Sequence, residues 1–178
     1  MKVFWSQDLF LKAFNFAAKA HGDQKIPGSD LPYITHVACV CAELMAVIDN
    51  TVDGDLILQC AALHDIIEDT EINYKDIFKE FGENIAEGVK SLSKNYNLAK
   101  EVQVEDSLSR ILKQPKEIWM VKMADRIINL SQPPSFWTSE KKQRYFEQSK
   151  LIYNTFKNTN KLLDQRLNTR IDKYKYYI

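Results

Sequence analysis

The residues Ala61-Ala62-Leu63-His64-Asp65-Ile66-Ile67-Glu68-Asp69-Thr70 place four ionisable side chains at the end of an apolar helical stretch. Residues four apart on a helix differ by about 40° around its axis, so we expect His64 to stack with Glu68 and Asp65 with Asp69. Three carboxylates this close repel one another and are costly to bury unless a cation offsets their charge. The stretch therefore indicates a divalent-metal site, and the alternative is a solvated helix end.

Further ligands for such an ion must come from other parts of the chain. His36 follows a turn-rich loop, although a lone histidine of this kind can also serve a purely structural role. Asp125 lies in the apolar stretch 119–130, where it must either pair with Arg126 or bind a ligand, and Asn129 follows one turn later on the same face. Two imidazoles and two carboxylates suit Mn²⁺, Fe²⁺ or Zn²⁺ and leave positions for water and a phosphate oxygen.

Apolar residues three and four apart predict helices along the whole chain, and no segment alternates long enough to predict a strand. The predicted helices cover about 7–21, 37–48, 55–68, 73–81, 84–92, 101–112, 115–130, 139–157 and 159–174. A loop rich in turn residues spans 23–35. With no repeat or break in composition, residues 1–178 are expected to form one all-α domain of about eight to ten helices.

Several helix ends carry their own signals in the sequence. Short polar side chains that accept a hydrogen bond from the first turn are favoured at helix starts, and a proline fits the first turn because it needs no amide donor. The expected capping residues are Ser6, Asn73, Ser139 and Thr159, with Pro115 in the first turn of its helix.

The composition narrows the class of protein. Five glycines and five prolines in 178 residues leave few tight turns, which disfavours sandwiches and barrels. No apolar run is long enough to span a membrane or to serve as a secretion signal, so we expect no membrane partner. Cys39, Cys41 and Cys60 lie in apolar helical stretches without CxxC spacing, so buried, reduced thiols and a cytoplasmic location are expected.

Taken together, the motifs resemble those of a known family. His36, His64-Asp65 and Asp125 match the H…HD…D pattern of the HD phosphohydrolase superfamily, and the chain resembles hydrolases of the RelA/SpoT type. More narrowly, it is similar to the single-domain small alarmone hydrolases, which include the metazoan SpoT homologue. The matching pieces are 17–21, 32–36, 61–70, 81–82, Val89, 121–130, Trp137, 145–146 and 159–160. The resemblance implies an HD-type helical bundle.

The resemblance also implies roles for particular residues. It makes His36, His64, Asp65 and Asp125 metal ligands, with Mn²⁺ the usual ion and other divalent metals possible, and makes Glu68 and Asp69 the pair that acts on the nucleophilic water. The residues implied to contact the substrate are Lys25, Lys94, Asn129, Lys141 and Tyr145. The implied reaction removes the 3′-diphosphate of guanosine 3′,5′-bis(diphosphate), which releases pyrophosphate and GDP or GTP.

One departure from the family pattern concerns the base. The family carries an arginine two residues after the glutamine of its loop, and here Ile26 follows Gln24 at that distance, with Lys25 the nearest cation. A planar guanidinium that could stack on guanine is missing. Two alternatives therefore stay open: an HD phosphohydrolase acting on another phosphorylated nucleotide, and a non-catalytic nucleotide sensor. Glu68 and Asp69 argue against the sensor, because a sensor needs no groups to activate water.

The net charge is zero, with 24 basic and 24 acidic residues, so no global basic field points to a nucleic-acid partner. The zero hides two opposite regions. Residues 43–87 hold twelve acids against two lysines, and residues 141–178 hold ten bases against three acids. The acidic region contains most of the predicted metal site and the basic region begins at a predicted phosphate contact, although solvated helix faces account for most such charges. The sequence leaves the oligomeric state open.

Overall fold

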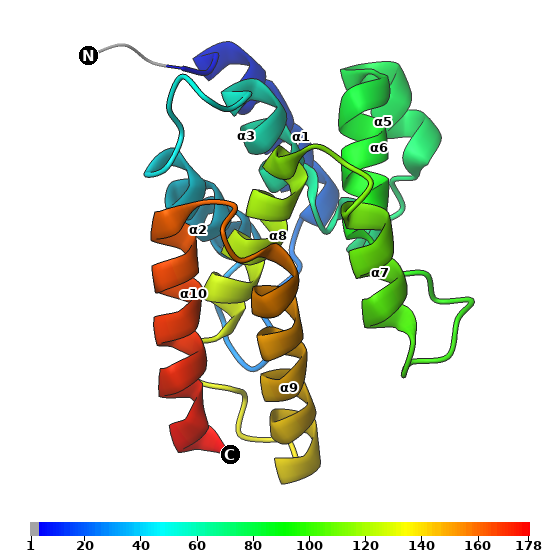
Figure 1. Cartoon of the computed structure of the whole chain (residues 1–178). Helices are drawn as coiled ribbons and strands as arrows, with labels where there is room; N and C mark the ends of the chain where they lie inside the picture. The colour runs from blue at the N-terminus through cyan, green and yellow to red at the C-terminus, as the bar shows by residue number, and fades with distance from the viewer. Residues whose placement is uncertain (1–3) are drawn as a thin grey trace.

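The computed structural model describes residues 4–178, and the regular structure in this range is helical (Figure 1). The helices are α1 (Gln7–His21), α2 (Ile34–Met45), α3 (Gly54–Leu63), α4 (Ile66–Asp69), α5 (Tyr74–Phe81), α6 (Glu83–Leu92), α7 (Gln103–Ile111), α8 (Lys116–Asn129), α9 (Ser139–Phe156), α10 (Lys161–Tyr174) and the 3₁₀ turn η1 (Lys175–Tyr177). The all-α prediction is confirmed. The predicted domain also includes residues 1–3, which lie outside the described range.

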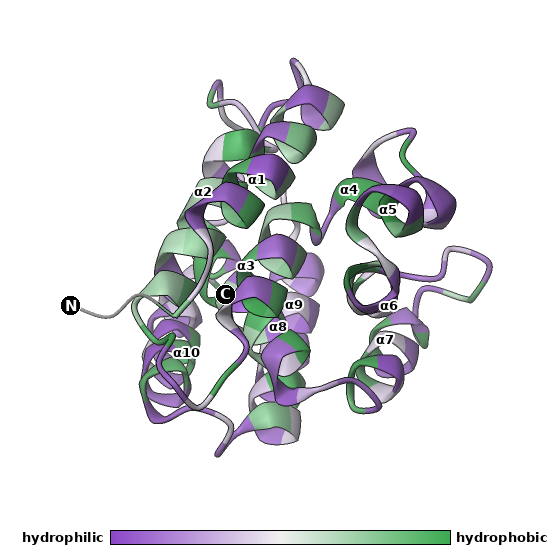
Figure 2. Ribbon diagram, turned by 90° about the horizontal axis from the view of Figure 1, so that it is seen from above, coloured by the Kyte–Doolittle hydropathy of each residue, from purple (hydrophilic) through white to green (hydrophobic). Residues whose placement is uncertain are grey.

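Helix α8 forms the centre of the bundle. It packs against α2, α3, α9 and α10, and more lightly against α6. In both views α5, α6 and α7 lie on one side of α8, and α2 and α10 lie on the other (Figures 1 and 2). Most of its residues from Glu117 to Ile127 are buried, as expected for a helix enclosed on several sides. Its two consecutive charged residues, Asp125 and Arg126, are therefore held inside the molecule.

A glycine allows α6 to approach the centre closely. A Cβ atom at Gly88 would lie 2.8 Å from both Cys60 Sγ on α3 and Ile118 Cδ1 on α8. Real Cβ atoms essentially never make contacts this short, so any larger residue would force these side chains or the helices that carry them to shift. Gly88 thus fixes the spacing between α6 and the α3–α8 pair.

Two of the predicted caps are confirmed in detail. The Ser6 hydroxyl accepts a hydrogen bond from the Leu9 amide at 3.3 Å. Asn73 and Asp76 form a reciprocal capping box. The Asn73 side chain accepts a hydrogen bond from the backbone of the first turn of α5, and the Asp76 side chain accepts one from the Asn73 backbone amide. Gly22 ends α1 with a φ of 49°, a left-handed conformation that suits glycine.

Two other caps lie one residue away from the predicted position. Thr138, and not Ser139, caps α9 by accepting from the Lys141 amide. Asn160, and not Thr159, caps α10, because its side chain accepts from two amides of the first turn while the Thr159 hydroxyl donates back to the Phe156 carbonyl. Pro115 occupies the N-cap position of α8, one residue before the predicted first turn.

The second helix begins and ends three residues earlier than predicted. It covers Ile34–Met45, because the chain already turns at Pro32 and Tyr33, whose carbonyls accept from the amides of Thr35 and His36. This shift places His36 in the first turn of α2, where it is buried. The helices predicted from 84 and 101 begin at Glu83 and Gln103.

The predicted continuous helix over 55–68 is wrong, because α3 ends at Leu63 and the short α4 begins at Ile66. The Ala61 carbonyl, which a continuous helix would reserve for the Asp65 amide, accepts a hydrogen bond from His64 Nδ1 at 2.7 Å. The Asp65 backbone relaxes to φ −101° and ψ −2°. The predicted stacking of His64 with Glu68 and of Asp65 with Asp69 assumed one continuous helix. Because the helix breaks between them, these pairs do not have regular helical spacing.

Two compositional predictions can be compared with the structure. Cys41 and Cys60 are buried, and burial raises the pKa of the Cys41 thiol to about 12. The prediction of burial is wrong for Cys39, which lies on the exposed face of α2. In the described part of the chain, no helix combines the length and apolar character needed to cross a bilayer.

Candidate functional site

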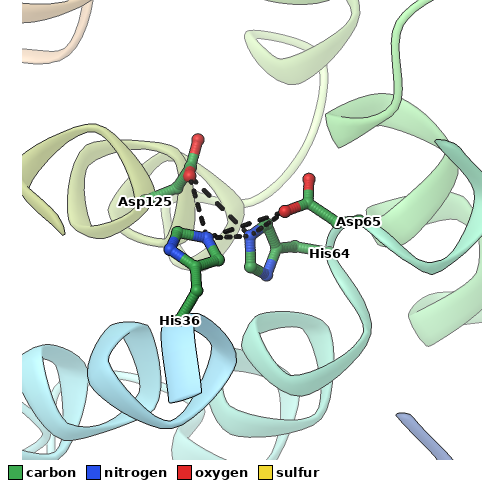
Figure 3. A group of neighbouring side chains, drawn as sticks. All are labelled: His36, His64, Asp65 and Asp125. Atoms are coloured by element: carbon green, nitrogen blue, oxygen red, sulfur yellow. Dashed lines mark hydrogen bonds and ion pairs between the residues drawn. The ribbon is translucent and has the colours of Figure 1, made fainter. Parts of the chain in front are cut away.

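Four side chains converge at the centre of the bundle (Figure 3). His36 comes from α2, His64 and Asp65 come from the break between α3 and α4, and Asp125 comes from α8. One ligand atom of each lies within 4.8 Å of the others. The structure therefore brings together all four residues that the sequence predicts as metal ligands.

The distances suit a shared cation. The two Nε2 atoms of His36 and His64 lie 3.2 Å apart, and each lies 3.5 to 3.7 Å from Asp125 Oδ1. Asp65 Oδ2 lies 2.8 Å from His64 Nε2 and 3.6 Å from His36 Nε2. Two ligands bound at about 2.1 Å to one ion, at angles of 90° to 110°, would be about 3.0–3.4 Å apart. The donor set thus fits a divalent metal with mixed nitrogen and oxygen ligands.

The tautomer of His64 supports the same interpretation. Its Nδ1 must carry the proton, because the partner at 2.7 Å is the Ala61 carbonyl. Nε2 of the neutral ring then presents a lone pair toward the cluster, as a metal-binding histidine requires. The two carboxylates outweigh the lowering effect of burial and raise the pKa of His64 to about 9. The cluster therefore favours a positive charge at His64 Nε2, which either a proton or a metal ion can supply.

Three neighbours hold the two carboxylates in place. Tyr33 donates its hydroxyl proton to Asp65 Oδ2, and Asn129 donates from Nδ2 to Asp125 Oδ1. Lys122 lies 3.2 Å from the other Asp125 oxygen. Burial raises the pKa of Asp125, but Lys122 and the two histidines outweigh it, so the pKa lies well below its usual range. Asp125 therefore pairs with Lys122 and not with the adjacent Arg126.

The predicted catalytic carboxylates have different surroundings. Glu68 accepts from both the backbone amide and Nζ of Lys94 at 2.7 Å and from the Tyr96 hydroxyl at 3.1 Å. Asp69 accepts a longer hydrogen bond from Gln24 Nε2, at 3.3 Å. Burial, and then the charge of Asp65, raise the pKa of Asp69. Glu68 is thus held by donors, whereas Asp69 is suited to accept a proton.

A cavity of about 250 Å³ opens beside the cluster. Its lining includes the acids Asp65, Glu68, Asp69 and Asp125, the cations Lys94, Lys122 and Arg126, and the polar residues Tyr33, Tyr96, Asn129 and Tyr145. Acidic and basic groups therefore face one space, as binding of a metal ion together with a phosphate group requires.

A second recess of about 370 Å³ adjoins this cavity and shares several of its lining residues, including Lys94 and Tyr145. The described residues that line it include four cations and no carboxylate, the cations being Lys94, Lys100, Lys141 and Arg144. Lys141 Nζ lies 4.1 Å from the centre of the Trp137 ring. We call this surface the outer recess.

The predicted substrate contacts therefore separate into three groups. Lys94, Asn129 and Tyr145 line the cavity beside the cluster. Lys141 lines only the outer recess. Lys25 lines neither space and is exposed, with Nζ 2.9 Å from Asp30. Lys122 is a cavity residue without a predicted role, although its position three residues before Asp125 places both on one helix face.

A protein-family model described as an HD domain matches residues 13–162. The chain belongs to the HD domain family. This HD domain is 28% identical, over 163 residues, to a fruit-fly protein named guanosine-3′,5′-bis(diphosphate) 3′-pyrophosphohydrolase MESH1, and the match covers 89% of this chain and 90% of that one. It is also 34% identical over 128 residues to the bifunctional (p)ppGpp synthase/hydrolase SpoT of Escherichia coli, covering 67% of this chain and 17% of that protein.

Solved structures share the architecture of this HD domain. One, described as a metazoan orthologue of SpoT that hydrolyses ppGpp, superposes with a TM-score of 0.83 and covers 96% of this chain and 98% of its own, at 24% identity. Another, from Listeria monocytogenes, has a TM-score of 0.64, is 20% identical and covers 80% of this chain. These matches confirm the predicted HD-type helical bundle.

His21 has a structural place beside the cluster. Its ring lies 4.8 Å from that of Tyr33, and its Nδ1 lies 2.7 Å from Gln24 Oε1. Tyr33 in turn packs against His36, with ring centroids 5.4 Å apart. The aromatic contacts of α1 and the 23–33 segment thus fix the tyrosine that donates to Asp65.

Proposed function

We propose that this HD domain is a metal-dependent hydrolase that removes the 3′-diphosphate from guanosine 3′,5′-bis(diphosphate). The observation that carries the proposal is the cluster of two histidines and two aspartates opening into a cavity lined by two further carboxylates and three cations. The names of the relatives that match most of the chain support the choice of substrate. We propose residues 1–178 as one catalytic unit.

In the proposed reaction, a water oxygen bonds to the phosphorus attached to the 3′-oxygen, and the bond between that phosphorus and the 3′-oxygen breaks. Pyrophosphate leaves and the ribose regains its 3′-hydroxyl. His36, His64, Asp65 and Asp125 would hold the ion, which we propose to be Mn²⁺. When bound, a divalent ion supplies Lewis acidity toward water and phosphate oxygens.

The two carboxylates beside the cluster take different roles in this proposal. Asp69 accepts the proton of the attacking water, because its pKa is raised and few donors occupy its oxygens. Glu68 holds Lys94 against the cavity through two hydrogen bonds. Lys94, Asn129 and Tyr145 then contact the substrate from the cavity wall, and Lys141 contacts it from the outer recess.

Assay of the purified protein with guanosine 3′,5′-bis(diphosphate) and Mn²⁺ tests the proposal. We expect release of one pyrophosphate per substrate, loss of release on chelation, and loss in Asp65→Ala. Asp172→Ala is the matched control, because Asp172 is an exposed aspartate of α10 that pairs only with Lys175 among the described residues. Metal binding without turnover would contradict the hydrolase and favour the sensor.

A second candidate is hydrolysis of another phosphorylated nucleotide, favoured by Ile26. Ile26 stands where the family arginine is expected, and neither Ile26 nor Lys25 lines the cavity. A panel of nucleotides assayed with Mn²⁺ separates the candidates. Ile26→Arg should improve turnover of guanosine substrates selectively if the base is otherwise read weakly, and Ile72→Arg, in a partly buried position away from both recesses, controls for the added charge.

We also propose that the protein is cytoplasmic and has no nucleic-acid partner. The balanced charge of the chain supports the absence of a nucleic-acid partner. The arrangement of charge fits a small anionic substrate better than a nucleic acid, since six cations line one recess of about 370 Å³ and one cavity of about 250 Å³. Such volumes fit part or all of a nucleotide.

A further inference from the structure

Arg126 is a buried charge that the proposed reaction has not yet used. Only 7% of the residue is exposed, and it lines the cavity beside the metal-ligand cluster. A guanidinium stays protonated at any physiological pH, so it cannot relieve the cost of burial by losing its charge. Buried charges of this kind are normally paired with an anion.

The expected anionic partner is missing in the described part of the chain, where no carboxylate oxygen lies within 4.0 Å of the Arg126 guanidinium. Its one hydrogen-bond acceptor there is the Ser149 hydroxyl, 3.3 Å from Nη1. The buried Nε has no hydrogen-bond partner. Several N–H donors of the Arg126 guanidinium are therefore left to bind a ligand.

The guanidinium is nevertheless held in position. Its central carbon lies 4.1 Å from the centre of the Tyr145 ring, which provides a face for the planar cation. Ser149 is itself fixed, because its hydroxyl donates to the Tyr145 carbonyl at 2.7 Å. Tyr145 and Ser149, one turn apart on α9, thus hold the arginine of α8 against the cavity.

The other two cations of the cavity are already paired. Lys94 forms an ion pair with Glu68 at 2.7 Å, and Lys122 forms one with Asp125 at 3.2 Å. A phosphate group binding to either lysine would compete with a carboxylate. Binding to Arg126 breaks no ion pair, and the fork of a guanidinium matches two phosphate oxygens.

We propose that Arg126 is the residue that binds the phosphate oxygens of the substrate's 3′-diphosphate in the inner cavity. This inference rests on the proposed function. It adds to Lys94 and Lys141 a cation that approaches the cleaved group from α8, the same helix that carries Asp125. The diphosphate supplies the missing negative charge beside the guanidinium, and the metal-ligand cluster and Arg126 then face one substrate group from two sides.

Inorganic pyrophosphate, which carries only the diphosphate chemistry, is the probe. We expect calorimetric titration of the Mn²⁺-loaded protein to show pyrophosphate binding at least tenfold weaker in Arg126→Gln than in the wild type. Arg126→Lys keeps the charge but loses the fork, so its affinity should fall between the two. Arg170→Gln, which removes a charge from α10 outside both recesses, should bind as the wild type does.

Mn²⁺ titration and thermal melts of each variant show whether the metal site and fold persist. If Arg126→Gln does not fold, Arg126→Lys decides the matter through its pyrophosphate affinity and the KM for the nucleotide, which should rise more than kcat falls. Wild-type pyrophosphate affinity and KM in the folded variant would overturn the assignment.

Failure of the proposed function gives a different result. If the wild type binds pyrophosphate but does not hydrolyse guanosine 3′,5′-bis(diphosphate), the reaction is wrong, and the titrations of Arg126 variants still test the phosphate site. If the wild type hydrolyses the nucleotide and Arg126→Lys and Arg126→Gln match it in affinity and KM, the reaction stands and the role of Arg126 is wrong.

Discussion

The metal-ligand cluster and the outer recess differ in how firmly the structure holds their side chains. His36, His64 and Asp125 are at most 6% exposed, and they come from segments that pack directly on one another. The outer recess is lined by Lys100, from the connection between α6 and α7, and by exposed cations of α9. The cluster is preorganised for one kind of chemistry, whereas Lys100, Lys141 and Arg144 of the recess are exposed and form no ion pair with any described residue. Substitutions in the two regions should therefore have very different effects.

The largest effect is expected from loss of a cluster carboxylate. Asp125→Asn keeps the size of the side chain but removes the charge that two histidines and Lys122 surround. Removing a group that merely supports a ligand weakens metal binding by about 10- to 100-fold, so removing the ligand should exceed that range and abolish measurable pyrophosphate release. Titration with Mn²⁺ and the release assay measure both losses.

Asp172→Asn is the matched control for this substitution, and it should leave both measurements unchanged because Asp172 lies on the surface of α10. Added Mn²⁺ should also raise the Tm of the wild type, since an ion that binds only the folded state stabilises it. The same ion should raise the Tm of Asp125→Asn much less. Equal Mn²⁺ affinity in Asp125→Asn and wild type would disprove the ligand role of Asp125.

The next largest effect should separate the two carboxylates beside the cluster. Asp69→Asn is expected to lower kcat by about 10²- to 10⁴-fold, the usual contribution of a general base, while Mn²⁺ affinity stays close to that of the wild type. Steady-state kinetics with a parallel Mn²⁺ titration measure the two quantities. Glu71→Gln, an exposed carboxylate two residues further along, is the control. A fall in metal affinity as large as the fall in kcat would instead make Asp69 part of the metal site.

A smaller effect is expected at the hydrogen bond that supports Asp65. Tyr33→Phe keeps the ring packed between His21 and His36 and removes only the hydroxyl that donates to Asp65. Metal affinity should fall by about 10- to 100-fold, with kcat at saturating Mn²⁺ close to the wild-type value. Mn²⁺ dependence of the rate checks this, with Tyr176→Phe, at an exposed tyrosine, as the control. An unchanged Mn²⁺ dependence would show that this hydrogen bond does not tune the site.

The smallest effect is expected in the outer recess. The double variant Lys141→Ala/Arg144→Ala should raise the KM by about three- to tenfold and leave kcat unchanged, because exposed charge pairs contribute at most about 1 kcal/mol each. The effect should shrink as salt is added. KM measured at two ionic strengths tests this against Arg170→Ala/Lys173→Ala on α10. A loss of kcat in the Lys141/Arg144 variant would mean that the recess takes part in chemistry after all.

The fold was largely predictable because each helix carries its own signal. Apolar spacing placed all the long helices, and the caps at Ser6 and Asn73 were correct because their hydrogen bonds are local. The break at residues 64–65 was not predicted, because apolar spacing does not show that His64 donates to the Ala61 carbonyl or that its ring lies against His36 and Asp125.

The metal ligands of the candidate site were easier to predict from the sequence than the cations that line the cavity. His64, Asp65 and Asp125 stood out because a histidine or carboxylate within an apolar stretch is anomalous in any sequence, whereas His36 was assigned mainly through the resemblance to the H…HD…D pattern. The cations were harder to predict, because the sequence does not show whether a lysine side chain near a motif points into the cavity or into solvent. Lys25 lies on the surface beside Asp30. The cavity is lined by Lys122, which had no predicted role, and by Arg126, which was predicted only as a possible ion-pair partner of Asp125.

The sequence by itself determined the helical class, because apolar residues recur at helical spacing, and it supplied the candidate ligands through their residue types and the resemblance to the H…HD…D pattern. Only the tertiary structure decided which cations share the cavity and which of them remain unpaired. That distinction depends on distances between helices far apart in the chain, such as α8 and α9, and on the carboxylates that each cation meets there. The unpaired charge of Arg126 is a property of the packed molecule, and no local pattern around residue 126 encodes it.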